Sequence, residues 1–137
     1  MRLAGLLVLL TLAGCGAPAH ATALDVTDYW VDDDGQIRHQ FHSGSHAVTC
    51  SGGKAVHMLV LTVAGNDWPE KDAWRVHSDG HVSPAMELEY WSSGQGGALH
   101  VYGCLAVGAT VDELTYEPDG HVQARAAVDR APTATGP

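Results

Sequence analysis

Residues 73–82 read Ala73-Trp-Arg-Val-His-Ser-Asp-Gly80-His-Val82, and this pattern decides the fold class. Its Asp-Gly dipeptide lies between two short runs rich in apolar and β-branched residues. Asp-Gly is typical of a tight turn between antiparallel strands, because both central residues of such a turn adopt positive φ. The same pattern occurs in residues 28–37 and 113–122, with the turn glycines 45 and 40 residues apart. The three segments therefore predict three hairpin turns.

A second pair of segments is also similar. Residues 53–65 align with residues 96–108 at a spacing of 43, which puts His57 and His100 at equivalent positions. The chain can thus be divided into two units of about 40 residues and a final hairpin, as expected of an internal repeat. Recurring turn signals also arise by chance in proteins made of hairpins, and both interpretations stay open.

Strand signals dominate between these turns. Met86, Leu88 and Tyr90 alternate with Glu87 and Glu89, which predicts that the three apolar residues face one side of a strand and the two acids the other. No stretch after residue 14 keeps a helical apolar period for three turns. Strands are expected at residues 26–32, 36–42, 46–50, 55–63, 73–77, 86–91, 98–107, 111–116 and 121–127. The sequence predicts an all-β fold, a small antiparallel barrel or sandwich of eight to ten short strands.

The N-terminus has the features of a secretory signal. Arg2 precedes a short apolar run, and residues 12–15 read Leu-Ala-Gly-Cys. This ending resembles the lipobox of bacterial lipoproteins, and the resemblance implies a lipid on Cys15 as the first mature residue. Gly16 is not acidic, which by the same resemblance favours the outer membrane, with the domain facing the periplasm or the surface. We expect a signal peptide over 1–14, a tether over 15–23, a β-domain over 24–128 and a disordered tail over 129–137.

Charge and cysteine content narrow the class of protein further. Seven basic residues less Arg2 leave six against sixteen acidic ones, a net charge of −10 after cleavage. An acidic surface argues against nucleic acid as a partner and favours cationic partners or simple solubility. Cys50 and Cys104 are an even pair in an exported chain, which predicts a disulfide. A metal pair is the weaker alternative, because no Cys-x-x-Cys spacing occurs.

The sequence lacks the motifs of a catalytic or cofactor site. Gly-x-Ser-x-Gly, His-Glu-x-x-His and glycine-rich phosphate loops do not occur, so we expect no enzyme activity and no cofactor. His39, His42 and His46 are the densest group of histidines, but 39 and 42 would point to opposite faces of a strand. Residues 32–37 resemble part of a calcium loop whose first and last ligand positions fail. We therefore predict no metal site.

The stretch of greatest functional interest is an aromatic pair that enters a small polar turn. Tyr90, Trp91, Ser92, Ser93 and Gly94 form a candidate partner-binding rim, since Tyr and Trp are favoured anchors in protein interfaces. The alternative is that one aromatic belongs to the core and the turn is plain.

Residues 46–106 resemble the bacterial c-type lysozyme inhibitors, small periplasmic or lipid-anchored β-barrels. The likeness rests on residues 48–56 around Cys50, on the Tyr-Trp-Ser-Ser-Gly of residues 90–94, and on the place of Cys104. Residues 78–84 lack the Ser-Gly-x-x-Tyr loop of that family, and Ser93 replaces its charged hairpin residue. The resemblance implies a non-enzymatic envelope protein that inhibits, or gives immunity to, lysozyme or another wall hydrolase. A lipoprotein that binds metal through its histidines and a structural accessory lipoprotein are the alternatives.

Overall fold

The computed structural model describes residues 23–41, 44–64, 70–92 and 96–133. Nine strands and no helix lie within these residues, which confirms the expected all-β fold. The strands are β1 (Ala23–Asp32), β2 (Gln36–Phe41), β3 (Gly44–Thr49), β4 (Lys54–Ala64), β5 (Trp74–Ser78), β6 (His81–Ser92), β7 (Gly97–Ala106), β8 (Glu113–Tyr116) and β9 (Ala124–Ala127). Each matches one of the nine stretches expected from the sequence.

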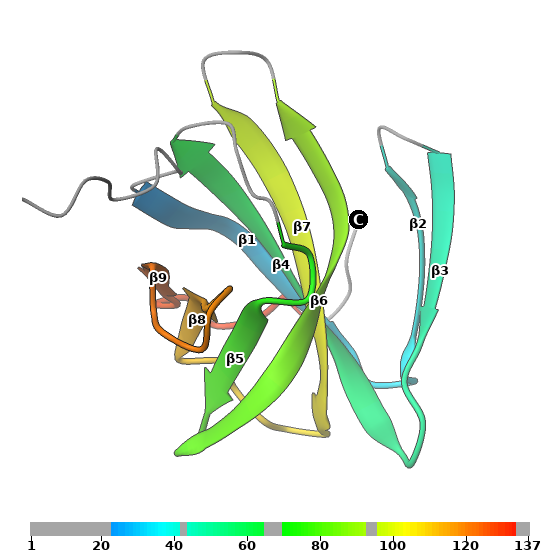
Figure 1. The fold of residues 1–137 in the computed structure, drawn as a ribbon. Helices are drawn as coiled ribbons and strands as arrows, with labels where there is room; N and C mark the ends of the chain where they lie inside the picture. The colour runs from blue at the N-terminus through cyan, green and yellow to red at the C-terminus, as the bar shows by residue number, and fades with distance from the viewer. Residues whose placement is uncertain (1–22, 42–43, 65–69, 93–95, 134–137) are drawn as a thin grey trace, which may run out of the picture.

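Seven strands form one antiparallel sheet in the order β1-β4-β7-β6-β5-β8-β9. The sheet curls until β9 comes next to β1, so that it forms a nearly closed barrel (Figure 1). Strands β2 and β3 form a separate two-stranded sheet that stands beside the barrel.

The three Asp-Gly dipeptides are turns, but they serve different purposes. Asp79 and Gly80 both have positive φ, 50° and 78°, and join β5 to β6 in a two-residue hairpin. This short turn explains why β6 begins at His81, five residues before the expected start. Gly35 (φ 70°) instead joins β1 to β2, which belong to different sheets, so the hairpin expected there is wrong. Gly120 lies between β8 and β9, which pair.

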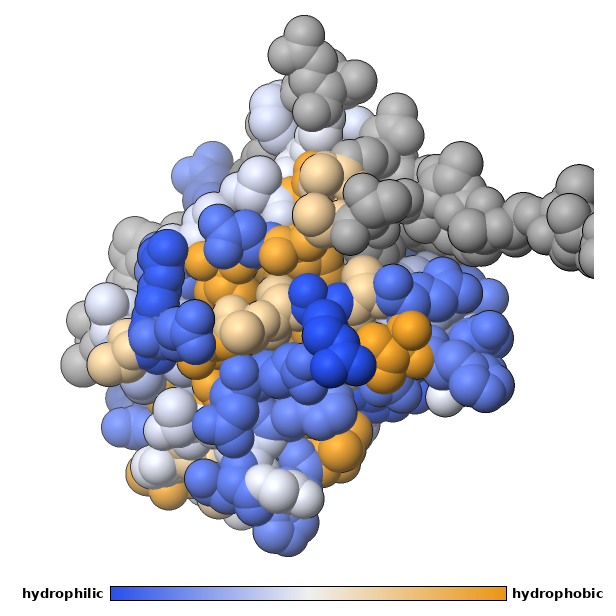
Figure 2. All heavy atoms as spheres, turned by 90° about the vertical axis from the view of Figure 1, so that its left-hand side faces the viewer, coloured by the Kyte–Doolittle hydropathy of each residue, from blue (hydrophilic) through white to orange (hydrophobic). Residues whose placement is uncertain are grey.

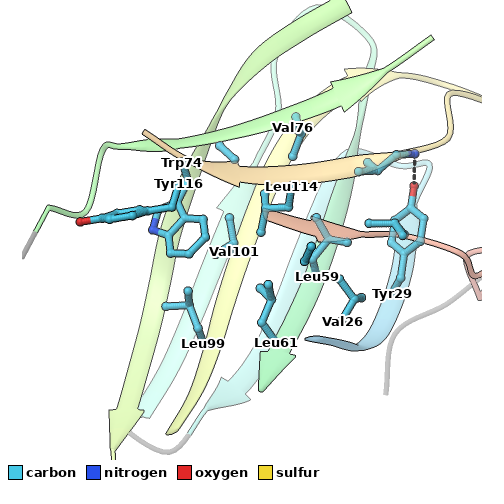
Figure 3. Close-up of a cluster of buried hydrophobic side chains, with 14 of the residues drawn as sticks. Val26, Tyr29, Leu59, Leu61, Trp74, Val76, Leu99, Val101, Leu114 and Tyr116 are labelled. Carbon is cyan, nitrogen blue, oxygen red and sulfur yellow. Dashed lines mark hydrogen bonds between the residues drawn. The ribbon is translucent and has the colours of Figure 1, made fainter. Parts of the chain in front are cut away.

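The barrel interior is a continuous apolar core. Figure 3 shows side chains from β1, β4, β5, β7 and β8 that meet inside it. The Trp74 and Tyr116 rings lie 4.9 Å apart between centroids. The buried residues drawn and labelled there are Val26, Tyr29, Leu59, Leu61, Trp74, Val76, Leu99, Val101, Leu114 and Tyr116.

A second apolar cluster lies on the outer face of β4, beneath the β2–β3 hairpin. Ile37 and Val48 of the hairpin pack there with Trp30, Val56 and Met58. The β2–β3 hairpin thus covers one part of the barrel's outer face.

A disulfide between Cys50 and Cys104 closes this arrangement. Cys50 directly follows β3 and Cys104 lies in β7, with a Cα–Cα distance of 5.5 Å. The predicted pairing is confirmed. It links the end of the β2–β3 hairpin to the barrel wall.

The C-terminal residues extend the domain beyond its expected end at residue 128. Thr133 forms a parallel bridge with Trp30: its N–H donates to the Tyr29 carbonyl at 3.0 Å and its carbonyl accepts from the Val31 N–H at 3.1 Å. The expected disordered tail is therefore wrong for residues 129–133, because β1 offers an edge with backbone groups to satisfy. The described residues do not include the predicted signal peptide, Cys15, residues 16–22 or residues 134–137. No helix within the described ranges is long and apolar enough to span a membrane.

Candidate functional site

The β6–β7 hairpin carries the aromatic pair singled out in the sequence. Tyr90 pairs with Leu99 and faces the barrel interior, where it packs against the core. Trp91 pairs with Ala98, faces outward and keeps 45% of its surface exposed. Of the two aromatic residues, Trp91 is therefore the one placed to meet a partner. Ser92 ends β6, whereas Ser93 and Gly94 lie outside the described residues.

Two glycines let this hairpin close tightly. A Cβ on Gly97 would lie 2.2 Å from the Trp91 carbonyl oxygen, and one on Gly96 would lie 2.8 Å from the Val63 carbonyl oxygen. Real Cβ atoms do not approach backbone atoms so closely, so both positions need glycine. Gly97 thereby holds the backbone of Trp91 against the start of β7.

A β-bulge in β6 decides which side chains share the face with Trp91. The β6–β7 register shifts between Glu87 and Glu89. As a result Glu87 pairs with Val101 on the interior face, while Glu89 pairs with His100 on the outer face. The expected alternation is wrong, because Leu88 is an extra residue in β6. The β6 side chains after it therefore point to the face opposite to the one that the sequence pattern predicts.

We call the outer side chains of this hairpin the outer strip: Met86, Leu88, Glu89, Trp91, His100 and Tyr102. Met86 is 39% exposed, and the Tyr102 hydroxyl donates to its sulfur at 3.3 Å. Glu89 Oε2 and His100 Nδ1 lie 3.8 Å apart. The strip thus combines exposed apolar atoms with a partly buried acid–imidazole pair. Sequence reasoning missed Met86 and Tyr102, which the register alone brings to this face.

Apolar surface is also exposed elsewhere. Figure 2 shows the side on which β8 and β9 lie, where hydrophobic residues form a band bordered by hydrophilic ones. Val122, between β8 and β9, is 44% exposed. Since its exposed fraction is close to that of Trp91, Val122 is a matched control for exposure alone.

The barrel interior holds a polar pair that contributes to folding. Tyr29 and His57 are both buried, and the Tyr29 hydroxyl lies 2.7 Å from His57 Nδ1. Burial is the main cause that lowers the pKa of His57 and raises the pKa of Tyr29. Both groups are therefore neutral near pH 7, and a hydrogen bond joins the hydroxyl of Tyr29 to Nδ1 of His57.

The other histidines were the candidates for a metal site. The β2–β3 register puts His39 opposite His46, and His42 lies outside the described residues. Among the residues that the structure describes, no group of three or more His, Cys, Asp or Glu could hold a metal ion. His57 and His100, equivalent in the aligned segments, face opposite sides of the sheet. The similarity of those segments therefore does not extend to burial.

Comparisons of this chain with protein-family models, with curated proteins and with solved structures find no match.

Proposed function

We propose that this protein is a non-enzymatic binding protein of the bacterial cell envelope that docks onto a protein partner through its outer strip. The observation that carries the proposal is that the 45% exposed Trp91 and the 39% exposed Met86 lie on the same outer face of a strand pair closed by Gly97. A half-exposed Trp on a rigid strand is a typical interface anchor, because it can bury a large area with little loss of side-chain freedom.

The partner is a basic wall hydrolase, such as a lysozyme, which the protein inhibits or neutralises. The acidic net charge supports this class of partner, because it would speed the encounter with a cationic enzyme. The resemblance of residues 46–106 to lysozyme inhibitors also supports it. Ser93 and Gly94, which follow Ser92 in the sequence, are included in the proposed contact.

The protein is anchored by a lipid on Cys15 and sits at the outer membrane. The support is the Leu-Ala-Gly-Cys sequence after a short apolar run, with a non-acidic Gly16. Anchoring would keep an inhibitor close to the wall on which hydrolases act.

Inhibition of wall lysis tests the proposal. Purified protein is mixed with a c-type lysozyme and, separately, with bacterial wall hydrolases, and lysis of cell walls is followed. We expect one of these enzymes to be inhibited and Trp91→Ala to weaken inhibition at least tenfold, about 1.4 kcal/mol. Val122→Ala is the control and leaves inhibition unchanged. Absence of inhibition at any ratio would refute the hydrolase as partner, and equal losses in the two variants would refute the strip as the site.

A further inference from the structure

A hollow of about 390 Å³ lies at the end of the barrel opposite the β6–β7 turn. Its lining comes from the first residues of β4 and β6, the end of β5 with the turn that follows it, the last residues of β7 and the loop after β7. It includes Lys54, His81, Ser83, Leu105, Ala106 and Ala109. The volume falls within the range of small-molecule and peptide sites, roughly 300–1,000 Å³. The proposed hydrolase contact does not use this region.

The hollow occupies a seam where two neighbouring strands part. The β6–β7 ladder ends at the pair Met86 and Tyr102. Beyond it, His81–Ala85 of β6 pairs with β5, and Gly103–Ala106 of β7 pairs with β4, but the two segments form no ladder with each other. Continued register would put Pro84 opposite Cys104, and proline has no N–H to donate, so the ladder stops. Two strand edges therefore line one hollow.

Strand edges of this kind bind extended peptides. A peptide laid along an edge gains main-chain hydrogen bonds, and the pockets beside it select its side chains. Ser83, Ala106 and Ala109 are small, so a peptide backbone can approach the two strand edges closely, and the limited volume of the hollow favours short side chains on the peptide. The available volume suits about two or three small residues.

The charge in the hollow indicates which end of a peptide enters. Lys54 belongs to the lining, and no carboxylate of the described residues lies within ion-pair distance of its ammonium group. Lys54 pairs with Ala106 at the end of β7, so it stands where the seam opens. Asp79 is the acidic residue of the lining and lies in the β5–β6 turn. A terminal carboxylate near Lys54 would form an ion pair that no carboxylate of the described residues supplies.

We propose that this hollow binds a short extended peptide with small side chains and a free C-terminal carboxylate. The peptide adds as a strand in the seam between β6 and β7, and its carboxylate pairs with Lys54. This is a second site, independent of the outer strip.

Titration with a tripeptide tests the site. The probe is acetyl-trialanine with a free carboxylate, and the readout is the set of backbone amide shifts of the isotope-labelled protein. We expect saturable shifts at Ser83 and Leu105. Lys54→Met, or a C-terminal amide on the peptide, weakens binding about tenfold, as expected for loss of one charge-assisted contact. Lys71→Met, the matched control, has no effect.

Other outcomes would overturn the proposal. They are the absence of saturable shifts up to about 10 mM peptide, equal binding of the acid and the amide, and shifts confined to the outer strip. A further outcome is that the amide shifts of Ser83 and Leu105 change with protein concentration when no peptide is present. This would show that a second copy of the chain, and not a peptide, binds in the seam. We expect Trp91→Ala to leave peptide binding unchanged. A failure of the peptide proposal can therefore be distinguished from a failure of the hydrolase proposal.

Discussion

The hydroxyl of Tyr29 lies 2.7 Å from Nδ1 of His57 inside the barrel, although 28 residues separate them in the chain. The same hydroxyl accepts the N–H of Val111 at 3.1 Å, the bond drawn as a dashed line in Figure 3. One side chain thus satisfies a buried imidazole of β4 and a buried backbone group just before β8. It ties the first strand of the barrel to one of the last.

Loss of this hydroxyl should destabilise the fold. Tyr29→Phe leaves the Val111 N–H and His57 Nδ1 without their partner, and each buried polar group left unsatisfied costs about 1–3 kcal/mol. We expect the free energy of unfolding, measured with urea, to fall by at least about 2 kcal/mol. The control is Tyr102→Phe, which removes an outer hydroxyl whose bond goes to the Met86 sulfur. A cost equal to that of the control would contradict this role for Tyr29.

The stability of the protein should depend on the protonation of His57. Its folded pKa is lowered below 6.5, mainly by burial, so the folded state binds fewer protons than the unfolded chain in slightly acidic solution. This contribution is therefore complete above pH 6.5 and is lost as the pH falls below that value, by at most about 1.4 kcal/mol per pH unit.

Unfolding curves from about pH 8 to about pH 5 check this for the wild type and for His57→Gln. The wild type should lose more stability than the variant over the acidic part of that range. Burial raises the pKa of Glu87, so this residue changes the pH dependence of stability in the opposite direction. Glu87 is present in both proteins, and its effect therefore cancels when their stabilities are subtracted. Parallel curves would show that His57 does not titrate differently on unfolding.

The disulfide should contribute strongly to stability. It joins residues 54 apart, and closing a loop of that size in the unfolded chain contributes roughly 4 kcal/mol on the chain-entropy model. The double variant Cys50→Ala, Cys104→Ala should unfold at lower urea concentration, with a loss of about 2–4 kcal/mol. Amide exchange of the β2–β3 hairpin should rise more than that of β4. Uniform acceleration across both elements would argue against a local anchoring role.

Gly97 and Gly103 should respond differently to alanine. The new Cβ at residue 97 meets a backbone oxygen at 2.2 Å, whereas at residue 103 it meets a methyl group of Val76 at 3.1 Å. A side chain can shift and the paired backbone of Trp91 cannot, so Gly97→Ala should cost more, at least about 2 kcal/mol. Thermal or urea unfolding of both variants measures the difference. A larger cost for Gly103→Ala would contradict the close approach at the hairpin.

The anchor prediction concerns Cys15. If its side chain carries the lipid, Cys15→Ser prevents attachment, and the protein either stays unprocessed or leaves the membrane fraction. Fractionation of cells followed by mass spectrometry of the N-terminal peptide distinguishes these forms. Processed variant protein that still sediments with membranes would contradict lipidation at this residue.

The strands themselves were predictable from the sequence because their signals are local. Apolar and β-branched runs such as residues 55–63, separated by dipeptides such as Asp79-Gly80, specify strand and turn within a few residues. The Cys50–Cys104 pair was predictable because, once Cys15 is assigned to the predicted lipid, the two remaining cysteines allow one pairing. All of these depend on residue types close together in the chain or on a simple count.

The face to which each side chain points and the partners of each strand were determined only by the tertiary structure. The bulge at Leu88 sends Glu87 inward and Glu89 outward, although the sequence alternates without a break. Thr133 attaches to β1 because the curled sheet leaves that edge open, and Tyr29 reaches His57 because β1 pairs with β4. A period-two pattern in the sequence shows which residues alternate along a strand. Which set of side chains points into the barrel depends on the hydrogen-bonded pairing with a strand far away in the chain, and that pairing forms only when the barrel closes.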